Sequence, residues 1–255
     1  MENIYQIFEK YKGLFISGTI TTIKISIVAT IIGLIIGLLM GGIRTIPIQK
    51  GAKGVIQKIV NLIIAAYVGV FRGTPMMVQA SLIFYGAPLF LGVDIDRTLA
   101  AYIIVSINTG AYMSEVVRGG IISIEKGQWE AARSSGLTHW QTMFNVIIPQ
   151  TMRNILPATG NEFVINIKDT SVLNVIGVSE LYFAGRTVAG QTYDYFGTYF
   201  VIMIIYLVLT TVITWVLRGI EKYLEGPQSF ELKMGNQRQV WDGDIKNRKS
   251  NKDFW

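Results

Sequence analysis

The chain has 255 residues, of which 51% are hydrophobic and 16% charged, with a mean hydropathy of +0.41. This composition is too apolar for an ordinary soluble domain of this size and indicates a protein that folds in a lipid bilayer. The absence of cysteine excludes disulfides and thiolate metal sites, and the single histidine, His139, leaves little scope for a metal centre or a hydrolytic triad. The net charge of +6 does not indicate nucleic acid, because basic residues in so apolar a chain mark cytoplasmic loops.

Residues 1–13 contain four charged side chains and lack the pattern of a cleavable signal, so we expect a short extracytoplasmic N-terminal segment. Residues 25–43 then contain no charge. At about 1.5 Å per residue this run can cross a hydrocarbon core of about 30 Å. Gly33, Gly37 and Gly41 recur within it at a spacing of four, which predicts a face on which another helix packs closely.

A basic segment follows the first predicted span. It contains Arg44, Lys50, Lys53 and Lys58. This concentration predicts a cytoplasmic loop and places the N-terminus outside. The apolar run of residues 59–70 is short for a crossing, and the sequence Arg72-Gly73-Thr74-Pro75 interrupts it. We therefore expect one long, broken second span that ends near Leu91.

Three more spans are expected downstream, at residues 98–117, at about 144–178 and at 199–217. The predicted fold class is all-α: a polytopic membrane protein with about five transmembrane helices in residues 14–224. Residues 225–255 mix basic and acidic side chains with few apolar ones and predict a cytoplasmic C-terminal tail.

The fourth predicted span is not uniformly apolar. Its polar side chains are Asn161, Glu162, Asn166, Lys168, Asp169, Thr170 and Ser171. Glu162, Asn166 and Asp169 stand at i, i+4 and i+7, a spacing that places them on one helix face. Ionisable groups at membrane depth are costly and usually face a bundle interior or a water-filled path. The stripe is therefore a candidate binding site, and the alternative is a structural network in which Lys168 pairs with an acid.

A polar helix pair is expected between the third and fourth spans, at about residues 121–143. Its central sequence contains Glu130, Ala131, Ala132, Arg133 and Gly136. The alanines offer a closely approachable surface and the glycine supplies a turn, which suits insertion into a groove of a soluble partner. The alternative is a helix that lies on the membrane surface.

These features resemble the permease subunits of ABC importers, in the branch that takes up polar amino acids. The resemblance extends from about Phe15 to Leu224. Its motifs are Glu130-Ala131-Ala132 with Gly136, Ile147-Ile148-Pro149-Gln150, Arg72-Gly73-Thr74-Pro75, Ala111-Tyr112-Met113-Ser114-Glu115 with Arg118-Gly119-Gly120, Lys126-Gly127-Gln128-Trp129, and Lys168-Asp169-Thr170-Ser171. Ser135 and Val172 stand where the family often has leucine.

The resemblance implies a multi-pass protein of the bacterial cell membrane, in contact with lipid. It implies a second permease copy or a sister permease, an extracytoplasmic amino acid-binding protein, and cytoplasmic ATPase subunits that dock on the E-A-A helices. The chain contains no Gly-Lys dipeptide and hence no phosphate-cradling loop of the G-x-x-x-x-G-K-[ST] type. We therefore expect ATP and Mg²⁺ on the partner ATPase, and neither a cofactor nor a catalytic residue in this chain.

In related permeases that hold an amino acid within the spans, the contacts come from the segments matching Asn161-Glu162 and residues 168–171. Two carboxylates with one nearby lysine favour arginine, lysine or histidine as the substrate, and glutamine and cystine stay open. Arg72 and Glu115 are expected to form structural pairs near the cytoplasmic boundary, and the alternative is contact with the ligand. The alternative functions are a secondary transporter or channel that uses the same polar stripe without an ATPase and, less favoured, a membrane enzyme.

Overall fold

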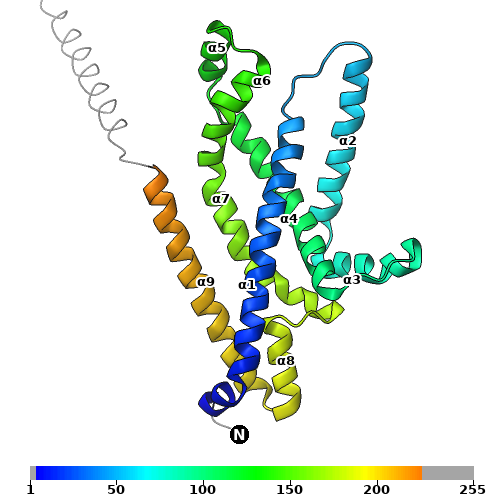
Figure 1. Ribbon diagram of the computed structural model, residues 1–255, viewed down its shortest axis with the longest axis vertical. Coiled ribbons are helices and arrows are strands. Elements are labelled where there is room, and N and C mark those ends of the chain that lie inside the picture. Colours follow the sequence, from blue (N-terminus) through cyan, green and yellow to red (C-terminus); the bar gives the residue numbers. More distant parts are fainter. Residues whose placement is uncertain (1–3, 226–255) are drawn as a thin grey trace, which may run out of the picture. The chain divides into compact units, whose positions relative to one another are not determined.

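The structure of the chain, a computed structural model, describes residues 4–225 (Figure 1). Its elements are α1 (Ile4–Ile43), α2 (Ala52–Gly73), α3 (Met76–Gly86), η1 (Ala87–Leu91), α4 (Arg97–Ile122), α5 (Lys126–Ser134), α6 (His139–Thr142), η2 (Met143–Ile147), α7 (Ile148–Asp169), η3 (Thr170–Ile176), α8 (Leu181–Thr192) and α9 (Tyr195–Glu225). All of these are helical, and no strand occurs among the described residues. The expected all-α fold class is confirmed.

The chain divides into two units, residues 1–217 and residues 218–255. The features described below belong to the first unit. Of the expected C-terminal tail, only Glu225 falls among the described residues, where it ends α9.

At the other end of the chain, α1 begins at Ile4, so residues 4–13 continue into the first span as one helix instead of forming a separate segment. Ile7 and Phe15 are buried in a cluster with Leu181 and Val188 of α8, which explains why the helix extends so far.

The first predicted span packs closely on α4, as its glycine spacing predicts. A Cβ atom added at any of the three glycines would collide with α4. The atoms in the way belong to Thr109 and Gly110 at Gly33, to Met113 at Gly37, and to Ser114 and Val117 at Gly41. In a bilayer, where lipid tails are as apolar as the helices, such backbone approach supplies the van der Waals contact that holds two helices together.

The second span differs from its expected form. Within the described residues, α1, α2 and the 195–224 part of α9 are long and apolar enough to cross a membrane. α2 has 22 residues, so it is longer than the apolar run at 59–70 because it starts at Ala52 and includes Lys53 and Lys58. Long lysine side chains can extend their ammonium groups to the membrane surface, so an uncharged run underestimates the length of a spanning helix.

A polar cluster stabilises the break between α2 and α3. Pro75 precedes α3 and carries no N–H group, so carbonyl oxygens at the end of α2 need other donors. The Gln79 Nε2 atom donates to the carbonyl oxygens of Phe71 at 3.0 Å and Thr74 at 2.9 Å. Asn108 of α4 donates in turn to Gln79 Oε1 at 2.9 Å. The break between α2 and α3 is therefore stabilised by specific hydrogen bonds, and the amides of Gln79 and Asn108 connect it to α4.

α4 lies at the centre of the first unit, where it contacts α1, α2, α3 and α7. Asp96 caps its N-terminus, and Oδ1 accepts hydrogen bonds from the backbone N–H groups of Thr98 at 2.9 Å and Leu99 at 3.1 Å. These hydrogen bonds lower the pKa of the Asp96 carboxyl, and the bond from the Leu99 N–H group contributes most. Among the long helices, α4 and α7 are less apolar than α1, α2 and α9. Neighbours surround α4 on several sides, as expected for polar groups at membrane depth.

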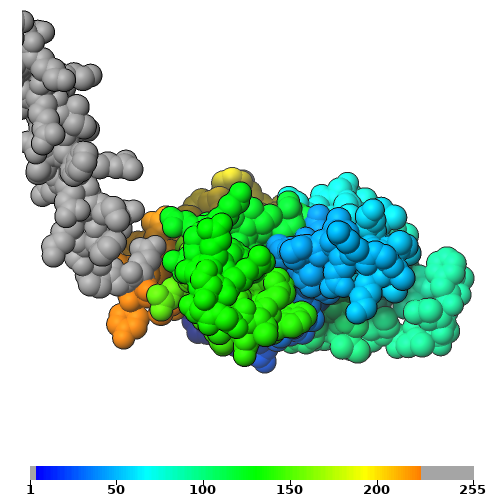
Figure 2. Space-filling view, turned by 90° about the horizontal axis from the view of Figure 1, so that it is seen from above, coloured from blue at the N-terminus to red at the C-terminus, as the bar shows by residue number. Residues whose placement is uncertain are grey.

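The two ends of the bundle carry different elements (Figure 1). The loop between α1 and α2 lies at the same end as α5 and α6, whereas α8 and the start of α1 lie at the opposite end. Figure 2 looks onto the first of these ends, where the surface of α5 and α6 projects beside the α1–α2 loop. The basic segment after the first span and the polar helix pair therefore share one face of the molecule.

Candidate functional site

The two carboxylates of the polar stripe lie two turns apart on α7. Glu162 is half-buried and Asp169 is exposed. Neither side chain forms a hydrogen bond or an ion pair within residues 4–225, and Asp169 lies within electrostatic range of Glu162. A pair of carboxylates without internal partners can accept hydrogen bonds from a ligand cation.

Asn166 does not share this open face. It is buried, and its amide joins three helices: Nδ2 donates to Thr30 Oγ1 of α1 at 3.0 Å, and Oδ1 accepts from Thr109 Oγ1 of α4 at 3.0 Å. The expectation that Glu162, Asn166 and Asp169 line one face thus holds only for the two acids. The position four residues after Glu162 sits 400° around the helix, and that 40° offset turns its side chain into the seam with α1 and α4.

The other members of the stripe divide in the same way. Asn161 and Lys168 are exposed, and Ser171 is half-buried. Thr170 is buried, and its hydroxyl donates to the carbonyl oxygen of Ile167 at 2.9 Å. Lys168 makes no direct ion pair with an acid among the described residues, but it lies within electrostatic range of Asp169. The structural network considered above is thus present only as a longer-range interaction.

Arg72, at the end of α2, faces the same region. Its guanidinium lies over the ring of Tyr112 of α4, 5.2 Å from the ring centre, and within electrostatic range of Glu162. A guanidinium on an aromatic face is held in place while its N–H groups stay available. The site thus gathers groups from α2, α4 and α7. The sequence predicted a structural pair for Arg72 and did not single out Tyr112, so neither was expected in the site, although both lie within quoted motifs.

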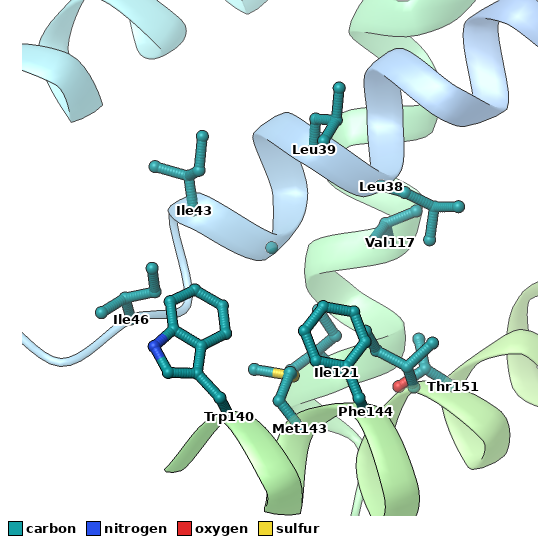
Figure 3. Close-up of a pocket in the computed structure, with 12 residues that line it drawn as sticks. Leu38, Leu39, Ile43, Ile46, Val117, Ile121, Trp140, Met143, Phe144 and Thr151 are labelled. Carbon is teal, nitrogen blue, oxygen red and sulfur yellow. The ribbon is translucent and has the colours of Figure 1, made fainter.

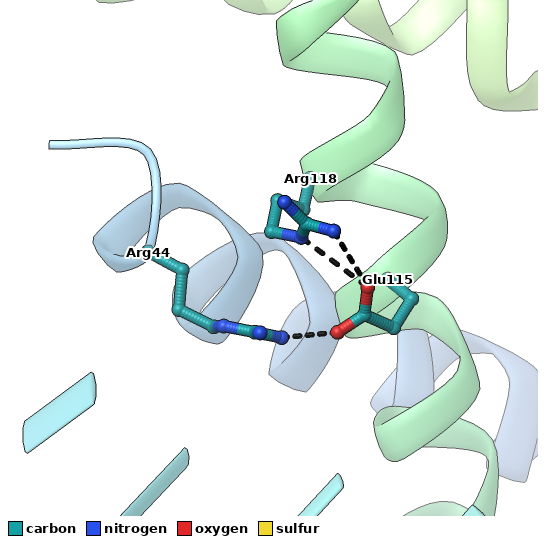
Figure 4. Close-up of polar contacts among 3 residues, drawn as sticks. All are labelled: Arg44, Glu115 and Arg118. Atoms are coloured by element: carbon teal, nitrogen blue, oxygen red, sulfur yellow. Dashed lines mark hydrogen bonds and ion pairs between the residues drawn. The ribbon is translucent and has the colours of Figure 1, made fainter. Parts of the chain in front are cut away.

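Glu115 forms a structural pair, as expected, but not with Arg72 (Figure 4). Its Oε1 atom accepts from Nη1 of Arg44 at the end of α1, and its Oε2 accepts from Nε and Nη2 of Arg118, both at 3.2 Å. One carboxylate therefore ties two arginines together across the α1–α4 seam. Because Glu115 binds Arg44 and Arg118, it does not pair with Arg72, whose guanidinium stays free of that carboxylate.

The polar helix pair consists of α5 and α6, which are shorter than the expected 121–143. Gly136 joins them with φ +79°, a left-handed conformation that favours glycine. Glu130, Ala131 and Arg133 are exposed, whereas Ala132 is buried and faces the protein. Of the two alanines, only Ala131 is on the open surface.

The α6 end of the pair is fixed by local contacts. Thr138 and Gln141 form a capping box at the start of α6. The ring of Trp129 stacks on that of His139 with centres 6.0 Å apart, so α5 is held against α6. These contacts fix the turn between the two helices, and so fix the position of the polar side chains on α5.

Comparison with known proteins decides the family. Residues 51–225 match the family described as binding-protein-dependent transport system inner membrane component. The chain belongs to this family. It is 37% identical to the glutamine transport system permease protein GlnP of Escherichia coli K12 over 168 residues, which cover 66% of this chain and 77% of that permease. It is 35% identical to the arginine transport system permease protein ArtQ of Bacillus subtilis over 159 residues, which cover 62% and 73%.

Solved structures agree with this family. The fold matches a chain of an amino acid ABC transporter crystallised with histidines, with a TM-score of 0.77, 37% identity, and coverage of 88% of this chain and 99% of that chain. A match to the MetNI methionine ABC transporter has a TM-score of 0.68 at 20% identity and shows the fold alone. The resemblance stated from the motifs is confirmed, and the permease belongs to the ABC transporters.

Proposed function

We propose that this permease forms the translocation path of an ATP-driven importer for polar amino acids, with a preference for basic ones or glutamine. The observation that carries the proposal is the pair of carboxylates on α7, Glu162 and Asp169, which form no hydrogen bond or ion pair among the described residues and lie in a region also reached by Arg72. An amino acid is a zwitterion. Its ammonium group would pair with the acids, and its carboxylate would meet the guanidinium of Arg72 through charge-assisted hydrogen bonds.

Relatives support the substrate class. The names of the similar permeases refer to glutamine and arginine transport. Arginine carries a second cationic group, for which a second carboxylate is a suited partner. Asn161 and Ser171, exposed and half-buried, would supply neutral hydrogen bonds beside the acids.

The test of the site is transport into proteoliposomes that contain the permease with its ATPase and binding protein. We expect Glu162→Gln with Asp169→Asn to raise the KM for arginine by about ten- to a hundredfold, as for one or two charge-assisted hydrogen bonds lost. Asp94→Asn, an exposed acid in the loop before α4, is the matched control and should transport normally. Unchanged uptake of arginine and glutamine by the double variant would remove the site from the path.

Coupling to the ATPase is assigned to α5 and α6. Glu130, Ala131 and Arg133 would contact the groove of the ATPase subunit, which binds ATP and Mg²⁺, and Ala132 would support them from within. We expect Gly136→Trp to insert and fold but to abolish amino acid-stimulated ATP hydrolysis, because a bulky side chain strains the left-handed turn and blocks the groove. Gly136→Asn, which tolerates this conformation, should retain coupling. Normal stimulation in the tryptophan variant would contradict the docking assignment.

Topology follows from the shared end of the bundle. The basic segment of residues 44–58 and the coupling helices lie at one end, which we assign to the cytoplasm. The N-terminus and α8 then face the binding protein outside. Single cysteines at Gly51 and at Asp94, in a chain that contains none, should react with an impermeant maleimide only from the inside and only from the outside, respectively. Labelling of both from one side would overturn the assignment.

A further inference from the structure

An apolar cavity of about 360 Å³ opens where the end of α1 meets the end of α4 and the segment from α6 to α7 (Figure 3). Its walls include Leu39 and Ile43 of α1, Val117 of α4, and Trp140 and Phe144 from the α6–η2 segment. Trp140 and Phe144 are largely exposed at its mouth. None of the elements of residues 4–225 fills the space, although it is large enough for several methylene groups.

One polar atom in the wall lacks a partner. Thr151 of α7 is 1% exposed, and its hydroxyl makes no hydrogen bond within the described part of the chain. Several other threonines in these helices donate to a backbone carbonyl one turn earlier, as Thr159 does to Ile155. A buried hydroxyl without a partner costs free energy. This oxygen is closed off from the cavity as well as from water, so the surface that a ligand meets is apolar. A ligand for this cavity is therefore apolar.

The charge beside the cavity indicates the headgroup. Ile46 lines the cavity, and Lys50 follows only four residues later, within about 14 Å of it by chain length. Lys50 and Lys53 are exposed and form no ion pair among the described residues. No acidic residue occurs between Arg44 and Arg72. This positive segment complements an anionic group at the membrane surface.

We propose that the cavity is a binding site for an anionic phospholipid, with one acyl chain between α1, α4 and the α6–α7 segment. The anionic headgroup lies against Lys50 and Lys53. The chain lies in a bilayer, so the ligand is present at high concentration wherever the protein is folded. The lipid thus joins the first span to the base of the coupling helices, since Trp140 of α6 and Ile43 of α1 line the same space. The proposal stands on the cavity and does not require the amino acid site.

The test uses fluorescence of Trp140 in delipidated permease held in detergent. The other tryptophans, Trp129, Trp215, Trp241 and Trp255, are replaced by phenylalanine. Titration with phosphatidylglycerol carrying brominated acyl chains should quench Trp140 in a saturable manner with one lipid per chain. Brominated phosphatidylcholine should bind about 25-fold more weakly, the effect expected for two lysines beside an anionic headgroup at about 1 kcal/mol each.

Glycine supplies a matched pair of variants. Gly42 lines the cavity and Gly13 lies on the same helix, and a Cβ at either position meets nothing within 4 Å. We expect Gly42→Leu to fill the cavity and weaken phosphatidylglycerol binding by at least about tenfold, as for roughly two methylene groups displaced. Gly13→Leu should bind like the parent.

Native mass spectrometry of the permease purified in mild detergent gives an independent measurement. The parent and Gly13→Leu should retain one phospholipid mass per chain, and Gly42→Leu should lose it. Equal quenching and equal lipid retention in Gly42→Leu would overturn the proposal, as would equal affinity for the two headgroups. A lipid-free dimer in which Trp140 is shielded would show instead that a second copy occupies the cavity.

Discussion

Gly37→Ala should destabilise the permease, because it adds one methyl group at the tightest part of the α1–α4 seam. A Cβ at Gly37 would stand 2.7 Å from the carbonyl carbon of Met113, whereas carbon atoms in contact are about 3.5–4.0 Å apart. Met113 is fully buried, and a backbone atom cannot rotate away as a side chain can. The helices must separate by roughly 0.8 Å, for which overpacking costs of about 1–3 kcal/mol are typical.

The assay is thermal unfolding of the purified permease in detergent, followed by the fluorescence of its tryptophans. A loss of 1–3 kcal/mol corresponds to a decrease in Tm of about 2–12 °C for a chain of this length. Gly13→Ala is the control, since its Cβ meets nothing within 4 Å, and it should be neutral or stabilising by up to about 1 kcal/mol. Equal Tm values for the two alanine variants would refute the claim that backbone approach holds the seam.

Two further substitutions test the polar contacts of the same helices. Glu115→Gln removes the charge shared by two arginines, and we expect the free energy of unfolding to decrease by about 1.5–3 kcal/mol. Added salt should make this decrease smaller, because salt already weakens the ion pairs in the parent protein. A decrease that does not depend on salt would count against the ion pairs. Asn166→Leu leaves the Thr109 hydroxyl without its acceptor and should cost about 1–3 kcal/mol while the KM for amino acid stays unchanged. If Asn166→Leu raised the KM for amino acid without a loss of stability, Asn166 would be a substrate-binding residue after all.

Much of the fold could be predicted from the sequence because bilayer thickness constrains each span separately. The uncharged run at 25–43, the glycine spacing and the break at Pro75 all have local physical causes, and the structure reproduces them. The start of α2 could not be read in this way. Its extra turns contain lysines, and a count of apolar residues stops at the first charge.

The candidate site shows a different division. Composition and order in the sequence predicted the acids of α7 as candidates, a turn at Gly136 and the family motifs. Only the tertiary structure decided that Asn166 belongs to a three-helix contact, that Glu115 pairs with Arg44, and that Arg72 lies near Glu162. Arg44 and Glu115 are 71 positions apart. The periodicity of one helix specifies which residues share its face, but the partner opposite that face depends on how the helices pack, and this packing is a property of the whole bundle.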